Sequence, residues 1–169
     1  MPKPGLENVP QFYHAYINLV ADADLNETFV QHQITLPALL QNLEPAKWNF
    51  QYAEGKWTIK EMVQHIIDTD RIFCYRALCF ARKESAALPG FDENNYAVAS
   101  RAARRNRSDL MEELKTVQRS SAQLFASFDE VDFQSGGISN GNYISVAAIG
   151  FSLVGHTLHH VNILKARYL

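Results

Sequence analysis

The sequence predicts an all-α protein that folds as a four-helix bundle. Apolar residues recur at helical spacing along most of the 169-residue chain, and no convincing run of alternating polar and apolar residues predicts a strand. Four long helical segments are separated by loops, and helices in this order pack naturally as a bundle. Hydrophobic residues make up 47% of the chain, and neither a linker nor an internal repeat divides it. Residues 1–169 are therefore expected to form a single domain.

The first long helix is expected over residues 25–43, with Asp24 or Asn26 as its N-cap. A shorter apolar segment, residues 11–20, precedes it and predicts a brief helix or an ordered arm. Pro37 lies inside the first long helix. Because proline lacks the N–H that an interior hydrogen bond needs, we expect it to kink or split this helix.

The second long helix has the clearest start in the sequence. Thr58 and Glu61 match a capping box, in which each side chain satisfies the backbone N–H of the other residue. This helix is expected to continue to about Glu84. The third long helix is expected over residues 108–128, where acidic residues in the first turns suit the helix dipole. The fourth is expected over residues 145–169.

Loops and short turns connect the long helices. Residues 44–56 contain proline, glycine and aromatic side chains that include Trp48 and Tyr52, and predict a connection packed down by its aromatic residues. Residues 88–91 are a break, and residues 93–99 predict a short helical turn. Glycine and asparagine–glycine pairs in residues 136–141 predict a loop that contains a tight turn.

Composition excludes several classes of function. Sixteen Lys and Arg against eighteen Asp and Glu give a net charge of −2, which does not predict nucleic-acid binding. The most apolar window, residues 144–158, is shorter than the ~20 residues that a membrane span needs, and the first residues lack a signal-peptide pattern. The side chains of Cys74 and Cys79 point in different directions around the predicted second helix, so no disulfide is expected. We therefore expect a cytoplasmic protein without nucleic-acid or membrane partners.

Histidines are the first candidates for chemistry, because three of the six crowd into five residues of the predicted last helix. His156 and His160 are four residues apart, so their imidazoles lie on one face and can reach a single metal ion. His159 is an alternative to His160 that spacing alone does not exclude. His65 lies on a polar face of the predicted second helix, and polar side chains aimed into a bundle commonly build metal or cofactor sites. This spacing fits a metal site, and it fits histidines satisfied within the core equally well.

Two charged residues share that face of the second helix. Asp68 lies one turn after His65, where it could act as a general base or orient an imidazole. Its alternative is a surface pair with Arg71. Arg76 lies roughly 16 Å from His65 along the helix. It could bind a substrate carboxylate at the end of a pocket, or form a salt bridge at the end of the bundle.

Three segments carry a family resemblance: WTIKEMVQHIIDTDRIFCYRAL (57–78), LPGFDENNY (88–96) and VGHTLHHVNILKARYL (154–169). From about Tyr16 to the last residue, the chain resembles the DinB-like superfamily, and especially its branch of YfiT-type metal-dependent hydrolases. The resemblance implies a four-helix bundle that holds a divalent metal ion with three histidines. Position by position, these fall on His65, His156 and His160, and His159 is left outside the ligand set.

The implied ligand set constrains the chemistry. Three neutral imidazoles leave a coordination position open, which is typical of catalytic sites. Zinc or nickel suits such ligands, and either ion can lower the pKa of a bound water or thiol. The resemblance thus implies an enzyme that transfers a low-molecular-weight thiol, such as bacillithiol or mycothiol, to an electrophilic small molecule, or a metal-dependent hydrolase.

Thiol transfer ranks first, because no obvious carboxylate base accompanies the histidines in the sequence. The alternative from another class is a non-enzymatic metal-binding or small-ligand-binding protein of a stress response. Long apolar helix faces are also compatible with a homodimer, although a bundle core explains them equally well.

Overall fold

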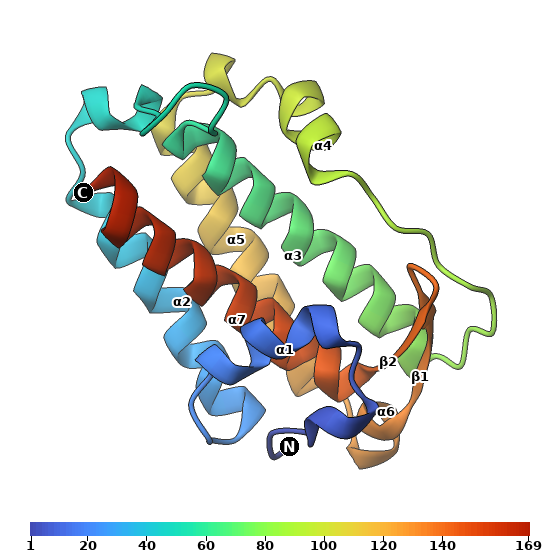
Figure 1. Cartoon of the computed structure of the whole chain (residues 1–169). Helices are drawn as coiled ribbons and strands as arrows, with labels where there is room; N and C mark the ends of the chain where they lie inside the picture. Colours follow the sequence, from blue (N-terminus) through green and yellow to red (C-terminus); the bar gives the residue numbers. More distant parts are fainter.

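The computed structural model describes residues 1–169 and confirms the predicted four-helix bundle (Figure 1). Helices α2 and α3 each pack against both α5 and α7, so α2 and α3 occupy opposite corners of the bundle. A π-helical turn, Leu164–Tyr168, extends α7 almost to the end of the chain. The four long helices are α2 (Leu25–Gln41), α3 (Ile59–Ala81), α5 (Arg107–Ala126) and α7 (Val146–Ile163).

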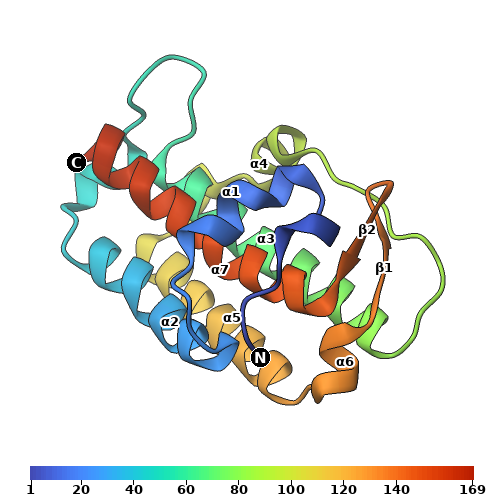
Figure 2. The same cartoon turned by 60° about the horizontal axis from the view of Figure 1, so that its bottom comes forward.

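Shorter elements cover the bundle on the sides where the long helices leave it open. Helix α1 lies along α7 and α4 lies against α3, as Figure 2 shows from a second direction. None of the helices combines the length and apolarity that crossing a membrane requires. The short elements are α1 (Gln11–Leu19), α4 (Glu93–Ser100), α6 (Glu130–Gln134), strands β1 (Gly136–Ser139) and β2 (Asn142–Ser145), and 3-10 turns at Leu6–Asn8, Pro45–Asn49 and Ala102–Arg104.

The hairpin of β1 and β2 corrects the expectation that the chain has no strands. The two strands pair in antiparallel register, from Gly136 opposite Ser145 to Ser139 opposite Asn142. The predicted tight turn lies at their tip, where Asn140 and the glycine after it both have positive φ. Each strand has four residues, which is too short for alternation to be recognised in the sequence.

Local capping explains where the long helices begin. The Thr58 backbone N–H donates to Glu61 Oε2 at 2.8 Å, and the Glu61 N–H donates to Thr58 Oγ1 at 3.2 Å, which confirms the capping box. Asp24 caps α2 by accepting from the backbone of Asn26. Helix α2 then runs unbroken through Pro37, so the helix is not split there. Pro37 is buried in the core, where tertiary packing stabilises the turn that lost a hydrogen bond.

Direct backbone contact places α1 on α7. A Cβ on Gly155 would lie 2.1 Å from the carbonyl oxygen of Tyr16, so only glycine allows α1 to approach this closely. The contact brings the aromatic side chains of α1 over the middle of α7. It therefore builds one wall of the pocket described below.

A buried polar layer crosses the centre of the bundle, with one side chain from each long helix. The Nε2 of His32 lies 3.0 Å from Thr157 Oγ1, 3.5 Å from Gln118 Nε2 and 3.6 Å from Asp70 Oδ2. Burial raises the pKa of Asp70 well above its ordinary value and lowers the pKa of His32 to about 3. The folded protein thus favours the neutral forms of both groups.

Asp70→Asn is expected to change how stability depends on pH. Because the folded-state pKa of Asp70 is raised, the folded protein binds more protons than the unfolded chain above about pH 4. The contribution of Asp70 to the free energy of unfolding therefore falls as the pH rises toward the folded-state pKa of Asp70, by up to about 1.4 kcal/mol per pH unit. Asp70→Asn lacks this loss, so in urea unfolding its free energy of unfolding should increase relative to that of the natural chain as the pH rises above about 4.

The exposed Asp22→Asn variant is the matched control and should follow the natural chain across the same pH range. Parallel pH profiles for Asp70→Asn and the natural chain would show that Asp70 is ionised in the folded protein.

Candidate metal centre

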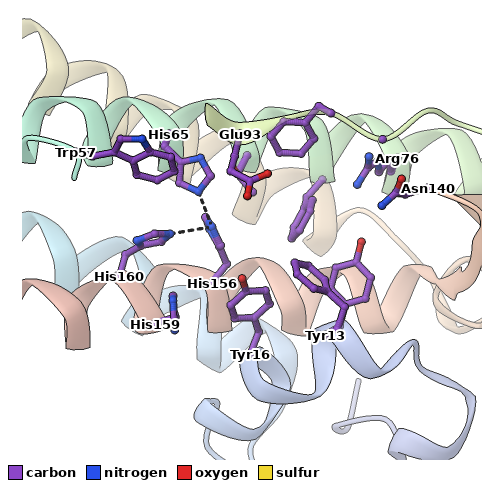
Figure 3. Close-up of a pocket in the computed structure, with 15 residues that line it drawn as sticks. Tyr13, Tyr16, Trp57, His65, Arg76, Glu93, Asn140, His156, His159 and His160 are labelled. Carbon is purple, nitrogen blue, oxygen red and sulfur yellow. Dashed lines mark hydrogen bonds between the residues drawn. The ribbon is translucent and has the colours of Figure 1, made fainter. Parts of the chain in front are cut away.

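Three histidine rings converge between α3 and α7 (Figure 3). His65 comes from the first half of α3, and His156 and His160 come from successive turns of α7. The Nε2 of His156 lies 2.9 Å from the Nε2 of His65 and 3.1 Å from the Nε2 of His160. All three side chains are buried, and their ligand atoms lie within 4.8 Å of one another.

This arrangement fits a cation better than it fits hydrogen bonds among the rings. A neutral imidazole Nε2 carries either one N–H or one lone pair, so His156 can complete only one of its two contacts well. A cation at the meeting point satisfies all three nitrogens together. In a tetrahedral zinc site with bonds of about 2.05 Å, neighbouring ligand atoms are about 3.3 Å apart, and the two contacts of His156 are close to that spacing.

Electrostatics keep the three imidazoles neutral. Burial, together with the neighbouring histidines, lowers the pKa of His65 to about 4 and that of His160 to about 3. Burial and the same neighbours hold the pKa of His156 well below its ordinary value. A metal ion binds only the neutral imidazole, so these residues are ready to act as ligands near pH 7.

Aromatic rings hold the histidines from both sides. The Trp57 ring lies 4.6 Å from His65 and 6.4 Å from His160, measured between ring centres. The Tyr16 ring lies 5.5 Å from His156 on the other side. The Tyr168 hydroxyl donates to the carbonyl of Trp57 at 2.6 Å, which ties the end of the chain to this wall.

A cavity of about 380 Å³ opens beside the three histidines. Its walls are mostly aromatic and come from α1, α3 and the segment before α4. Figure 3 shows the histidines at one end and Arg76 with Asn140 at the other. The open face of the candidate metal centre is therefore turned toward a space large enough for a small molecule.

Comparison with known proteins places the chain in a family. A model of the DinB superfamily matches residues 14–164. The chain belongs to the DinB superfamily. Among curated protein sequences, none matches this chain.

Two solved structures resemble this DinB-superfamily fold. YfiT from Bacillus subtilis, described as a probable metal-dependent hydrolase with an unusual four-helix bundle topology, aligns with a TM-score of 0.70 at 17% identity, over 96% of this chain and 89% of YfiT. A mycothiol-dependent maleylpyruvate isomerase aligns with a TM-score of 0.66 at 11% identity, over 94% of this chain and 62% of the isomerase. At these identities the likeness shows the fold, and it supports the four-helix bundle.

The DinB fold brings His65, His156 and His160 together. Two other candidates, His159 and Asp68, lie outside this group. His159 lines the cavity and its ring lies 5.4 Å from that of Tyr16, but it is not part of the converging group.

Asp68 does not line the cavity. Its Oδ1 accepts from Gln64 at 2.9 Å and lies 4.0 Å from Arg71 Nη1, on the side of α3 that faces α4 and α5. A step of three residues turns a side chain away from that of His65 by about 60°, and this rotation carries the carboxylate out of the pocket. The structure thus provides no contact through which Asp68 could act on the histidines.

Arg76 lies inside the pocket, buried and without a salt bridge. Its Nη2 donates to the carbonyl of Pro89 at 2.8 Å. The alternative of a salt bridge at the end of the bundle is therefore wrong.

The expectation that no carboxylate accompanies the histidines is also wrong, because Glu93 lines the pocket. Figure 3 shows its carboxylate pointing into the space between His65 and Tyr16. Glu93 is the first residue of α4, directly after the cap Asp92. The sequence signal was present in the segment LPGFDENNY, but only the fold shows that this segment covers α3.

Single alanine substitutions test the ligand set. His65→Ala, His156→Ala and His160→Ala should each weaken metal binding by at least about 10- to 100-fold, since even the loss of an orienting partner has this effect. His159→Ala is the matched control and should keep its metal. The measurement is elemental analysis of protein purified without a metal-affinity tag. Equal metal content in the natural chain and the His160→Ala variant would disprove this ligand set.

Proposed function

We propose that this DinB-superfamily protein is a divalent-metal-dependent enzyme that activates a nucleophile for attack on a small electrophile. The observation that carries the proposal is the convergence of three buried, neutral imidazoles at the wall of an open cavity. Three protein ligands leave a coordination position open, which is typical of catalytic sites. Zinc and nickel are the ions that suit this donor set best.

A divalent ion held by His65, His156 and His160 would act as a Lewis acid and lower the pKa of a thiol or water in its open position. The protein's own groups supply the other requirements. Because the three ligands are neutral, they would leave the positive charge of a bound ion uncompensated, which favours an anionic nucleophile. Glu93 faces the same space and is placed to accept a proton.

Transfer of a low-molecular-weight thiol is the first candidate reaction. The new carbon–sulfur bond forms while the bond between that carbon and the leaving group breaks. The thiol proton passes to the Glu93 carboxylate and departs with the leaving group, so the reaction needs no oxidant or reductant. Support comes from the positive charge that three neutral ligands would leave on a bound ion, and from the likeness to a mycothiol-dependent enzyme. Two free cysteines without a disulfide suit the reducing cytoplasm, where such thiols stay reduced.

Hydrolysis is the second candidate, and Glu93 favours it. A carboxylate at the open face can take a proton from an attacking water, and the likeness to YfiT supports this reaction.

A paired assay separates the candidates. Protein loaded with zinc or nickel is incubated with 1-chloro-2,4-dinitrobenzene and cysteine, bacillithiol or mycothiol, and separately with 4-nitrophenyl acetate alone. Metal-dependent loss of thiol supports transfer, and metal-dependent release of nitrophenol without thiol supports hydrolysis. Bound metal with neither reaction would favour a non-enzymatic binding protein instead.

Glu93→Gln should lower kcat of whichever reaction is found by about 10²- to 10⁴-fold, the usual contribution of a positioned base. Its metal content should not change, because Glu93 is outside the converging group. Glu112→Gln, on the exposed side of α5, is the matched control and should retain full activity. Full activity of the Glu93 variant would exclude it as the base.

Removal of the metal by a chelator should abolish activity and leave the helical far-UV signal intact. The fold buries 55 of its 169 residues, most of them hydrophobic, so its folding does not depend on an ion as that of a small zinc finger does. The melting temperature should fall only modestly. Loss of the helical signal at room temperature would instead make the metal a structural element.

A further inference from the structure

Arg76 is a buried cation without a counter-ion. The residue is 4% exposed, and its guanidinium forms no ion pair with any carboxylate of the chain. It is hydrogen-bonded to two neutral groups, the Pro89 carbonyl, 2.8 Å from Nη2, and the Tyr13 hydroxyl. Burial raises the pKa of Tyr13, so neither neighbour is an anion. An arginine buried to this degree is usually paired with an anion.

The guanidinium lies at the end of the cavity away from the histidines, beside the side-chain amide of Asn140 (Figure 3). Glu93 is the only carboxylate among the residues that line the cavity, and it lies between the two ends. Arg76 and Asn140 together therefore offer N–H donors to the cavity without a protein anion to receive them.

Backbone hydrogen bonds hold this end of the cavity in place. The Leu88 N–H donates to the Ile138 carbonyl at 2.9 Å, and the Asn140 N–H donates to the Leu88 carbonyl at 3.1 Å. Gly90 packs directly on Asn140, since a Cβ there would lie 2.2 Å from the Asn140 Oδ1. The wall over Arg76 is thus built by the hairpin rather than by a free loop.

The surroundings of Arg76 are aromatic. Its guanidinium carbon lies 5.9 Å from the centre of the Phe91 ring, and Phe73 continues the apolar wall toward His156, whose ring centre is 6.3 Å from that of Phe73. An apolar path therefore leads from the cation to the candidate metal centre.

We propose that the pocket takes small aromatic carboxylates, with the carboxylate on Arg76 and Asn140 and the ring along Phe73 and Phe91. The inference rests on the proposed function, because it gives the chemical class of the electrophile. Arginine binds a carboxylate through two parallel hydrogen bonds, and the cavity of about 380 Å³ suits a molecule of this size. The aromatic walls favour the electrophile over the thiol as the carrier of the carboxylate.

Calorimetric titration of chelator-treated protein tests the proposal without any catalysis. The probes are 3-phenylpropanoate, its neutral amide 3-phenylpropanamide, and 3-sulfanylpropanoate, which has the carboxylate but a thiol in place of the ring. The natural chain should bind 3-phenylpropanoate at least about 10-fold more tightly than the amide, as expected for a hydrogen-bonded charge pair. Equal binding of acid and amide, or tighter binding of 3-sulfanylpropanoate, would overturn the proposal.

Variants then assign the preference to Arg76. Arg76→Gln should bind acid and amide equally, and Arg76→Lys should keep a reduced preference because it keeps the charge but not the planar fork. Arg71→Gln, on the same helix but paired with Glu113 outside the cavity, should keep the full preference. An undiminished preference in Arg76→Gln would overturn the assignment.

These titrations use metal-free protein, so their outcome is independent of turnover. Absence of catalysis with a normal acid preference would refute the proposed enzyme and leave the carboxylate site standing. Catalysis without a preference for the acid over the amide would support the proposed enzyme and refute the carboxylate site.

Discussion

The candidate site depends on one constraint: α3 and α7 must stay in fixed register while three imidazoles are held out of water. A slip of one residue in either helix would rotate a ligand by about 100° away from the meeting point. Side-chain caps fix where both helices begin, with Thr58 and Glu61 at the start of α3 and Ser145 before α7. Packing of apolar side chains between the two helices then keeps the turns aligned.

The same constraint explains why the histidines are neutral. They are buried because α3 and α7 pack closely and because Trp57 and Tyr16 cover the rings. Burial lowers each pKa, so the packing that positions the ring nitrogens also keeps their lone pairs free. Geometry and protonation state therefore have a common origin in the fold.

Much of this structure could be predicted from the sequence, because helical periodicity and capping are local signals. The bundle, the start of α3 and the candidate ligands all follow from short-range patterns or from the family resemblance. The sequence left open whether Pro37 splits α2, since only packing decides whether the turn that lost a hydrogen bond stays helical. Glu93 and the pairing of the hairpin with residue 88 were also missed, because both depend on contacts between segments that are distant in the sequence.

The pocket draws its parts from two kinds of scaffold. Its candidate metal ligands come from two long helices in the core, where a change in one residue disturbs many neighbours. Its far wall comes from a hairpin tip joined to Leu88 by backbone bonds, and its near wall from α1, seated on Gly155. Changes in these short pieces can therefore alter the walls of the cavity while the three histidines keep their places on the two long helices.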